Sequence, residues 1–162
     1  MIRAELARAT IATPEAMHRF GVGLASHLRA GDLLVLAGPL GAGKTALTQG
    51  IGAGLEVTSA VTSPTFVIAR THQREAGQPD LVHVDAYRLG SPFELDDLDI
   101  DFENSIVVVE WGQGFFDPAD QPLLEIAISR DETGESEVRE LAATGFGERW
   151  AHSAWPVESW LQ

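Results

Sequence analysis

The chain of 162 residues contains no cysteine, and it has no long apolar run. The first absence excludes disulfide bonds, thiol nucleophiles and cysteine-bound metals. The second excludes a bilayer-spanning helix, which needs ~18 consecutive apolar residues. The first residues mix Glu5 and Arg8 with apolar neighbours, so they lack the apolar core of a signal peptide. From these absences we expect a soluble, cytoplasmic protein.

Basic residues are also scarce. The sequence has 11 Lys and Arg against 24 Asp and Glu, which gives a net charge of −13. Such an acidic surface repels the phosphate backbone of a nucleic acid. We therefore expect no tight, direct binding of nucleic acid by this chain. If its function involves RNA, a basic partner must hold the RNA.

One glycine-rich segment carries the main functional signal. The stretch Gly38-Pro39-Leu40-Gly41-Ala42-Gly43-Lys44-Thr45 fits G-x-x-x-x-G-K-[ST], the phosphate-binding loop (P-loop) of nucleotide-hydrolysing proteins. Backbone N–H groups of such a loop converge on phosphate oxygens, and the following helix adds the positive end of its dipole. In this role Lys44 pairs with the β- and γ-phosphates, and the Thr45 hydroxyl binds Mg²⁺. We expect residues 38–46, ending at Ala46, to bind the nucleotide.

The neighbouring sequence has the order that this loop requires. Residues 33–37 are an unbroken apolar run and predict a buried strand before the loop. Leu47, Ile51 and Leu55 recur every four residues after it and predict one face of a helix. The same helix contains three glycines, at 50, 52 and 54, which are unfavourable in a helix interior. We expect them to allow a close approach to a neighbouring element.

The rest of the chain alternates between strand and helix patterns. Thr13-Pro14-Glu15 predicts the start of a helix that Gly31 closes. Residues 2–12 are ambiguous between strand and helix, and we favour a strand. Other expected elements are strands at 67–71, 81–85 and 106–110, a short acidic helix at 92–98, and a hairpin of 123–129 with 138–143. This alternation predicts an α/β fold with a mostly parallel sheet, flanking helices and a C-terminal antiparallel hairpin.

Two of the expected strands end in an acid, Asp85 and Glu110. Ligands of parallel sheets bind outside the carboxyl ends of the strands, so both acids are predicted to converge with Thr45 at one edge. Hydrolysis of a γ-phosphate needs a bound metal ion and an oriented water, and these two acids are the candidates for those roles. The alternative is that either acid only caps a strand end or lies at the surface.

Other residues have two interpretations each. Ser63-Pro64-Thr65-Phe66 is a candidate switch that senses the γ-phosphate, or an ordinary turn before a strand. Arg88 is a cation near the phosphates or a solvated surface charge, and Trp111 lies near the nucleotide or packs in the core. We expect residues 1–162 to form one domain. Its tryptophan-rich tail, 146–162, holds Trp150, Trp155 and Trp160, which cover the core edge or dock a partner.

Four motifs in series resemble the TsaE (formerly YjeE) family. They are G-x-L-G-A-G-K-T at 38–45, S-P-T-F at 63–66, H-x-D-x-Y-R at 83–88 and E-W at 110–111. The P-loop alone occurs in very many families, but the four motifs in this order are specific. The resemblance covers residues 13 to about 145.

The resemblance implies an α/β ATPase that hydrolyses ATP slowly by itself. It implies docking on a heterodimer of the threonylcarbamoyl transferase and its non-catalytic partner, which modifies adenosine 37 of tRNAs that read ANN codons. Carried over by position, Thr45 and Glu110 match the Mg²⁺ ligands, and Lys44 with the loop amides matches the phosphate clamp. Asp85 matches an acid needed for hydrolysis, and Thr65 matches a switch-like threonine.

The chain departs from the family pattern at several positions. Pro39 stands where the family usually has Asp or Asn, Ala46 replaces the usual second Thr, and His72 stands where an aromatic residue is frequent. The tryptophan-rich tail lies outside the part of the chain that the resemblance covers. Two other functions remain open: a small-molecule P-loop kinase, and a nucleotide-dependent binding switch. Few basic residues, none clustered, speak against a kinase lid, and the absence of an N-K-x-D motif speaks against a guanine-specific switch.

Overall fold

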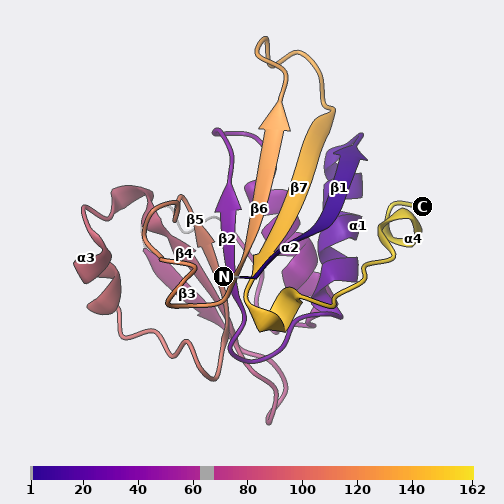
Figure 1. Ribbon diagram of the computed structural model, residues 1–162. Coiled ribbons are helices and arrows are strands. Elements are labelled where there is room, and N and C mark those ends of the chain that lie inside the picture. Colours follow the sequence, from indigo (N-terminus) through magenta and orange to yellow (C-terminus); the bar gives the residue numbers. More distant parts are fainter. Residues whose placement is uncertain (1, 63–67) are drawn as a thin grey trace.

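A seven-stranded sheet forms the centre of the fold (Figure 1). The computed structural model describes residues 2–62 and 68–162. Over these residues the strands run in the order β1-β7-β6-β2-β5-β4-β3. The strands are β1 (Arg3–Ile11), β2 (Leu33–Ala37), β3 (Ala69–His72), β4 (Leu81–Asp85), β5 (Ile106–Glu110), β6 (Leu123–Arg130) and β7 (Arg139–Phe146). The helices are α1 (Pro14–Ala25), α2 (Lys44–Gly54), α3 (Pro92–Asp96) and α4 (Val157–Trp160), with short 3₁₀ turns η1 (Ala86–Arg88) and η2 (Glu148–Trp150).

The centre of the sheet is parallel and its two sides are antiparallel. β2 pairs in parallel with β5 and β6, and β4 pairs in parallel with β5. β7 runs antiparallel to β6 and β1, and β3 runs antiparallel to β4. This arrangement confirms the predicted α/β fold with its C-terminal hairpin, and it adds β1 as the strand beside that hairpin.

Both faces of the central strands are covered. Alternate strand residues such as Leu34 and Val108 pack with α1 and α2, in a cluster that includes Phe20 and Leu47. The intervening residues of the same strands pack against the segment that contains α3, represented by Leu95. Because both faces are buried, the strands are continuous apolar runs rather than alternating ones.

Helices α1 and α2 pack closely because glycines line their contact. A Cβ atom at Gly50 would collide with the carbonyl oxygen of His18, and one at Gly54 would lie 2.6 Å from the Cβ of Ala25. Gly21 on α1 faces the same contact, where an added Cβ would lie 2.8 Å from the Ile51 nitrogen. The expected close approach of the glycine-rich helix is therefore confirmed, and its partner is α1.

The predicted end of the first helix is wrong. Thr13 caps α1 as expected, since its hydroxyl oxygen accepts a hydrogen bond from the Ala16 N–H at 3.1 Å. The helix ends at Ala25, however, and Gly31 lies in the turn before β2 with a φ of 92°. Its N–H donates to the Ser105 carbonyl at 2.9 Å, so a contact between distant segments, invisible in local sequence, sets this turn.

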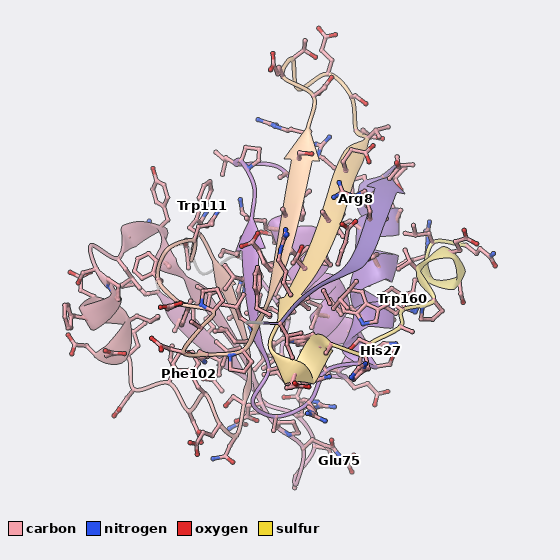
Figure 2. The ribbon with its side chains drawn as sticks, viewed as in Figure 1. Arg8, His27, Glu75, Phe102, Trp111 and Trp160 are labelled. Atoms are coloured by element: carbon pink, nitrogen blue, oxygen red, sulfur yellow. The ribbon has the colours of Figure 1, made fainter. Side chains whose placement is uncertain are left out.

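The C-terminal tail covers the edge of the core. Trp150 is 1% exposed and belongs to the cluster under α1 and α2. The rings of Trp155 and Trp160 meet Phe20 edge-on at 6.4 and 5.3 Å between centroids. Figure 2 shows Trp160 beside His27, with ring centroids 5.5 Å apart. The core-covering interpretation of the tail is confirmed. In the part of the chain that the structure describes, no helix has the length and apolarity to cross a bilayer.

We predict that Gly50→Ala destabilises the protein. Alanine favours a helix by about 1 kcal/mol over glycine, but here the added methyl must push α1 and α2 apart, at a cost of about 1–3 kcal/mol. Chemical unfolding monitored by circular dichroism measures the change. The control is Ala53→Gly at an exposed position of α2, where propensity acts alone. A Gly50→Ala protein more stable than wild type would contradict the tight contact.

Candidate functional site

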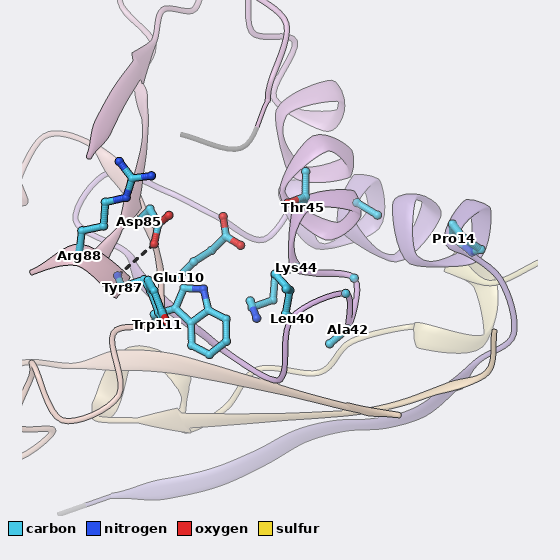
Figure 3. Close-up of a pocket in the computed structure, with 13 residues that line it drawn as sticks. Pro14, Leu40, Ala42, Lys44, Thr45, Asp85, Tyr87, Arg88, Glu110 and Trp111 are labelled. Atoms are coloured by element: carbon cyan, nitrogen blue, oxygen red, sulfur yellow. Dashed lines mark hydrogen bonds between the residues drawn. The ribbon is translucent and has the colours of Figure 1, made fainter. Parts of the chain in front are cut away.

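A hollow of 630 Å³ opens between the P-loop and the carboxyl ends of β4 and β5 (Figure 3). Lys44 and Thr45 line it from the start of α2, Asp85 from the end of β4, and Glu110 and Trp111 from the end of β5. These side chains come from three separate segments of the chain. The predicted convergence of Thr45, Asp85 and Glu110 at one edge of the sheet is therefore confirmed, while their chemical roles stay predictions.

The P-loop adopts a conformation that only its glycines allow easily. Gly41 and Gly43 have φ values of 79° and 115°, in the left-handed region that side chains disfavour. Gly43 is the N-cap of α2 and makes no side-chain hydrogen bond to the first turn. The N–H groups of that turn are therefore not occupied by a capping side chain, as an anion-binding helix N-terminus requires.

Lys44 is the only lysine in the sequence, and it lines the hollow. It is 5% exposed. Its Nζ donates to the carbonyl oxygens of Gly38 at 2.5 Å and Pro39 at 3.1 Å, and lies 3.8 Å from the centroid of the Trp111 ring. Burial lowers the pKa of Lys44, and the carboxylates of Glu110 and Asp85 oppose that effect.

The two acids lie side by side on neighbouring parallel strands, with Asp85 in register with Glu110. Figure 3 shows the Glu110 carboxylate between Asp85 and Lys44. Asp85 Oδ1 accepts a hydrogen bond from the Tyr87 N–H at 3.0 Å, so this acid also caps the turn η1. Glu110 is 5% exposed, and its Oε2 accepts a hydrogen bond from His83 Nε2 at 2.5 Å.

Trp111 is held in an unusual backbone conformation. Its φ is 61°, a value that bulky residues rarely adopt. This turn directly after β5 places the indole over Lys44, and Tyr87 meets the same ring edge-on at 5.3 Å between centroids. Trp111 thus lies in the hollow, as one of its two interpretations expected. Arg88 also lines the hollow, which favours its interpretation as a cation near the phosphates.

Most P-loop residues line the hollow, and the first two contact Lys44 through their carbonyl oxygens. Residues 40–46 line it, with Leu40 80% exposed and Ala42 buried. Gly38 and Pro39 contribute carbonyl oxygens to Lys44. The candidate switch, including Thr65, lies at positions outside the described residues, so its interpretation stays a prediction.

Sequence reasoning missed three participants. Pro14, at the start of α1, lines the hollow although it is distant in sequence from the P-loop. Arg139 on β7 donates to the Gly41 carbonyl at 3.3 Å. His83, in the middle of β4, forms a hydrogen bond with Glu110. Its place in the H-x-D segment was the one available signal.

The oxygen atoms in the hollow suit a magnesium ion shared with phosphates. Among residues 2–62 and 68–162 there is no group of three or more His, Cys, Asp or Glu side chains that could hold a metal. The hollow does gather the Thr45 hydroxyl and the carboxylates of Asp85 and Glu110. Mg²⁺ is commonly held in this way, by one or two carboxylates together with substrate phosphates and water.

Comparison with known proteins identifies the family. A family model described as "Threonylcarbamoyl adenosine biosynthesis protein TsaE" matches residues 11–140. The chain belongs to the TsaE family. This assignment confirms the resemblance inferred from the four sequence motifs.

Individual TsaE relatives agree over most of the chain. Three are named "tRNA threonylcarbamoyladenosine biosynthesis protein TsaE". The Streptomyces coelicolor protein is 53% identical over 83% of this chain and 94% of its own length. The proteins of Mycobacterium tuberculosis and Bacillus subtilis are 46% and 37% identical, over 75% and 78% of this chain and 78% and 77% of theirs. The crystal structure of Bacillus subtilis YdiB superposes with a TM-score of 0.72 at 28% identity, covering 99% of this chain and 96% of that one.

We predict that the pKa of Lys44 lies below 10.5 in the ligand-free protein. Because it is the only lysine, selective isotope labelling gives a single side-chain signal whose titration NMR spectroscopy can follow. Glu110→Gln should lower the pKa further, since it removes a negative charge that stabilises the ammonium group. A wild-type pKa at or above 10.5 would show that Lys44 is solvated rather than buried.

Proposed function

We propose that this TsaE protein is an ATP-hydrolysing subunit that supports threonylcarbamoylation of adenosine 37 in tRNAs reading ANN codons. The observation that carries the proposal is the meeting of the P-loop residues Lys44 and Thr45 with the acids Asp85 and Glu110 in one hollow. Family membership supports the pathway, because the relatives are named for the biosynthesis of threonylcarbamoyladenosine in tRNA.

When ATP binds, its phosphate oxygens replace loop carbonyl oxygens as hydrogen-bond acceptors for the Lys44 ammonium group. In the ligand-free protein its ammonium group is satisfied by two carbonyl oxygens of the loop and by the Trp111 ring. Phosphate oxygens are stronger acceptors because they are charged, and a hydrogen bond between two charged groups is roughly twice as strong as a neutral one. The N–H groups of the loop and of the first turn of α2 bind the same phosphates.

The nucleoside end extends along the P-loop towards α1. Lys44 fixes the phosphate end, and the far side of the loop borders a second hollow of 160 Å³. Pro14, Met17 and Ala46 line that hollow, with Glu137 and Arg139 at its polar side. Its apolar floor suits the flat face of a nucleobase, and its two charged side chains suit the polar edge.

Magnesium would be held by the Thr45 hydroxyl and the Glu110 carboxylate, together with phosphate oxygens. When bound, it supplies positive charge that compensates the charge developing on the transferred phosphoryl group. Lys44 would contribute to the same compensation through its ammonium group. Asp85 is the second carboxylate of the hollow and is the candidate for orienting the attacking water.

The acidic chain acts through partners rather than on tRNA. With a net charge of −13, it repels the tRNA backbone. We propose that it docks on the heterodimer of the threonylcarbamoyl transferase and its non-catalytic partner, which hold the tRNA. ATP hydrolysis then supports repeated turnover of that complex, and the transfer chemistry takes place on the transferase.

We predict that two substitutions in the hollow have separable effects. Lys44→Ala should reduce ATP affinity by at least about tenfold, since it removes the P-loop cation that would pair with the phosphates, and a charged hydrogen bond contributes about 1.5–3 kcal/mol. Glu110→Ala should leave nucleotide binding partly intact but lose Mg²⁺-dependent phosphate release. Calorimetry measures the binding, and a phosphate-release assay with ATP or GTP measures the hydrolysis.

The same assay separates the alternative functions. Phosphorylation of an added small-molecule acceptor would support a kinase, and a preference for GTP would support a binding switch. Normal turnover by Lys44→Ala would contradict the assignment of the site. Equal hydrolysis by Glu110→Ala and wild type would reduce Glu110 to a structural acid.

We also predict that the transferase heterodimer captures this protein in a nucleotide-dependent way. A pull-down with ATP and then with ADP should retain different amounts, because loss of the γ-phosphate changes the contacts in the hollow at the sheet edge. Lys44→Ala should abolish the difference between the two nucleotides. Equal retention of the wild type with ATP, with ADP and without nucleotide would contradict coupling between hydrolysis and docking.

A further inference from the structure

His83 is a buried polar residue to which the proposed chemistry assigns no role. It lies in the middle of β4 between Val82 and Val84, and it is 0% exposed. Its Nε2 bonds Glu110 Oε2 at 2.5 Å, while its Nδ1 is buried and has no hydrogen-bond partner among the described residues. An unpaired polar atom in a core destabilises the fold, so a valine or leucine here would pack at lower cost.

The sheet register explains how His83 reaches Glu110. β4 and β5 run in parallel, with His83 opposite Val108 and Asp85 opposite Glu110. Side chains two residues apart on a strand share a face, so Glu110 lies on the same face as Val108, the α2 side of the sheet. His83 therefore meets Glu110 diagonally across the two strands, from the interior of the sheet towards its edge.

The contact also defines which nitrogen of the imidazole ring donates. A carboxylate only accepts, so Nε2 carries the hydrogen and donates to Oε2. Nδ1 is buried and has no hydrogen-bond partner among the described residues, so Nε2 is the ring nitrogen that acts through a hydrogen bond. Among the described residues, His83 is the one hydrogen-bond donor to the Glu110 carboxylate.

We propose that His83 is a positioning residue that fixes the Glu110 carboxylate through Nε2–H···Oε2, leaving Oε1 to bind the metal ion. This inference rests on the proposed function, in which Glu110 is a magnesium ligand. A carboxylate on a flexible side chain that is held by one oxygen loses less conformational freedom when the other oxygen binds. Partners of metal ligands commonly act in this way, and their loss costs about 10–100-fold in metal affinity or activity.

Two amide substitutions separate positioning from simple filling of space. In His83→Gln the amide nitrogen lies as many bonds from Cβ as imidazole Nε2, so it can still donate to Glu110. In His83→Asn the amide nitrogen takes the place of Nδ1 and falls short of Glu110. Both variants keep a polar amide in the same core position, so each is the matched control for the other.

The first measurement is a Mg²⁺ titration of the protein bound to a non-hydrolysable ATP analogue. Calorimetry gives the Mg²⁺ concentration that saturates this complex. His83→Asn should raise that concentration by about 10–100-fold, and His83→Gln should remain near wild type. Affinity for the analogue in EDTA should be the same in all three proteins, because the P-loop is untouched. A buried-histidine control is His72→Asn, since His72 is 3% exposed and bonds Ser59 at 2.8 Å rather than Glu110.

The second measurement needs neither nucleotide nor metal. In ligand-free wild type labelled with ¹⁵N-histidine, the signal that disappears in His83→Gln belongs to His83. It should show a slowly exchanging Nε2–H, and Glu110→Ala should shift that signal and speed its exchange. This spectrum tests the hydrogen bond even if His83→Asn fails to fold.

The outcomes separate this inference from the proposed function. A wild type that binds the nucleotide with no dependence on Mg²⁺ would overturn the proposed function and this inference with it. A wild type that depends on Mg²⁺, with His83→Asn unchanged, would overturn this inference alone. Equal losses in the Gln and Asn variants, or a His83 signal unaffected by Glu110→Ala, would also overturn it.

Discussion

The parallel pairing of β5 with both β2 and β4 is the constraint on which the rest of the structure depends. Parallel strands end at the same edge, so the P-loop after β2 meets the acids that end β4 and β5. The pairing is stabilised by burial on both faces, where Ile106 to Val109 are 0% exposed. Any slip of one residue would turn Glu110 to the other face, towards α3.

Charge in the hollow is distributed around a single cation of the P-loop. Lys44 faces two carboxylates, Asp85 and Glu110, on a chain whose net charge is −13. A free nucleotide adds further negative charge to this site, so its binding requires compensation beyond one ammonium group. The N–H groups of the loop and a magnesium ion held by Thr45 and Glu110 would supply that compensation. Nucleotide and metal are therefore expected to bind together.

Much of the fold and of the hollow could be predicted because the signals are local. The apolar runs at 33–37, 81–85 and 106–110 each became strands with those bounds, and the P-loop pattern located Lys44 and Thr45. What could not be predicted depends on contacts between distant segments. Gly31 turns against Ser105, and the donor to Glu110 comes from the neighbouring strand. Spacing along one segment carries no information on such pairs.

Three unfavourable features of the structure lie at this hollow, and others, such as the unpaired buried nitrogen of Trp155 and the left-handed backbone of Glu56, lie elsewhere. Lys44 is buried, Trp111 has a left-handed backbone, and His83 has an unpaired buried nitrogen. Elsewhere in the central strands the same depth is filled by aliphatic residues. Strain and buried polar groups persist where they serve binding or chemistry. An anionic ligand would directly offset the cost of burying Lys44, because its negative charge favours the ammonium form that burial disfavours.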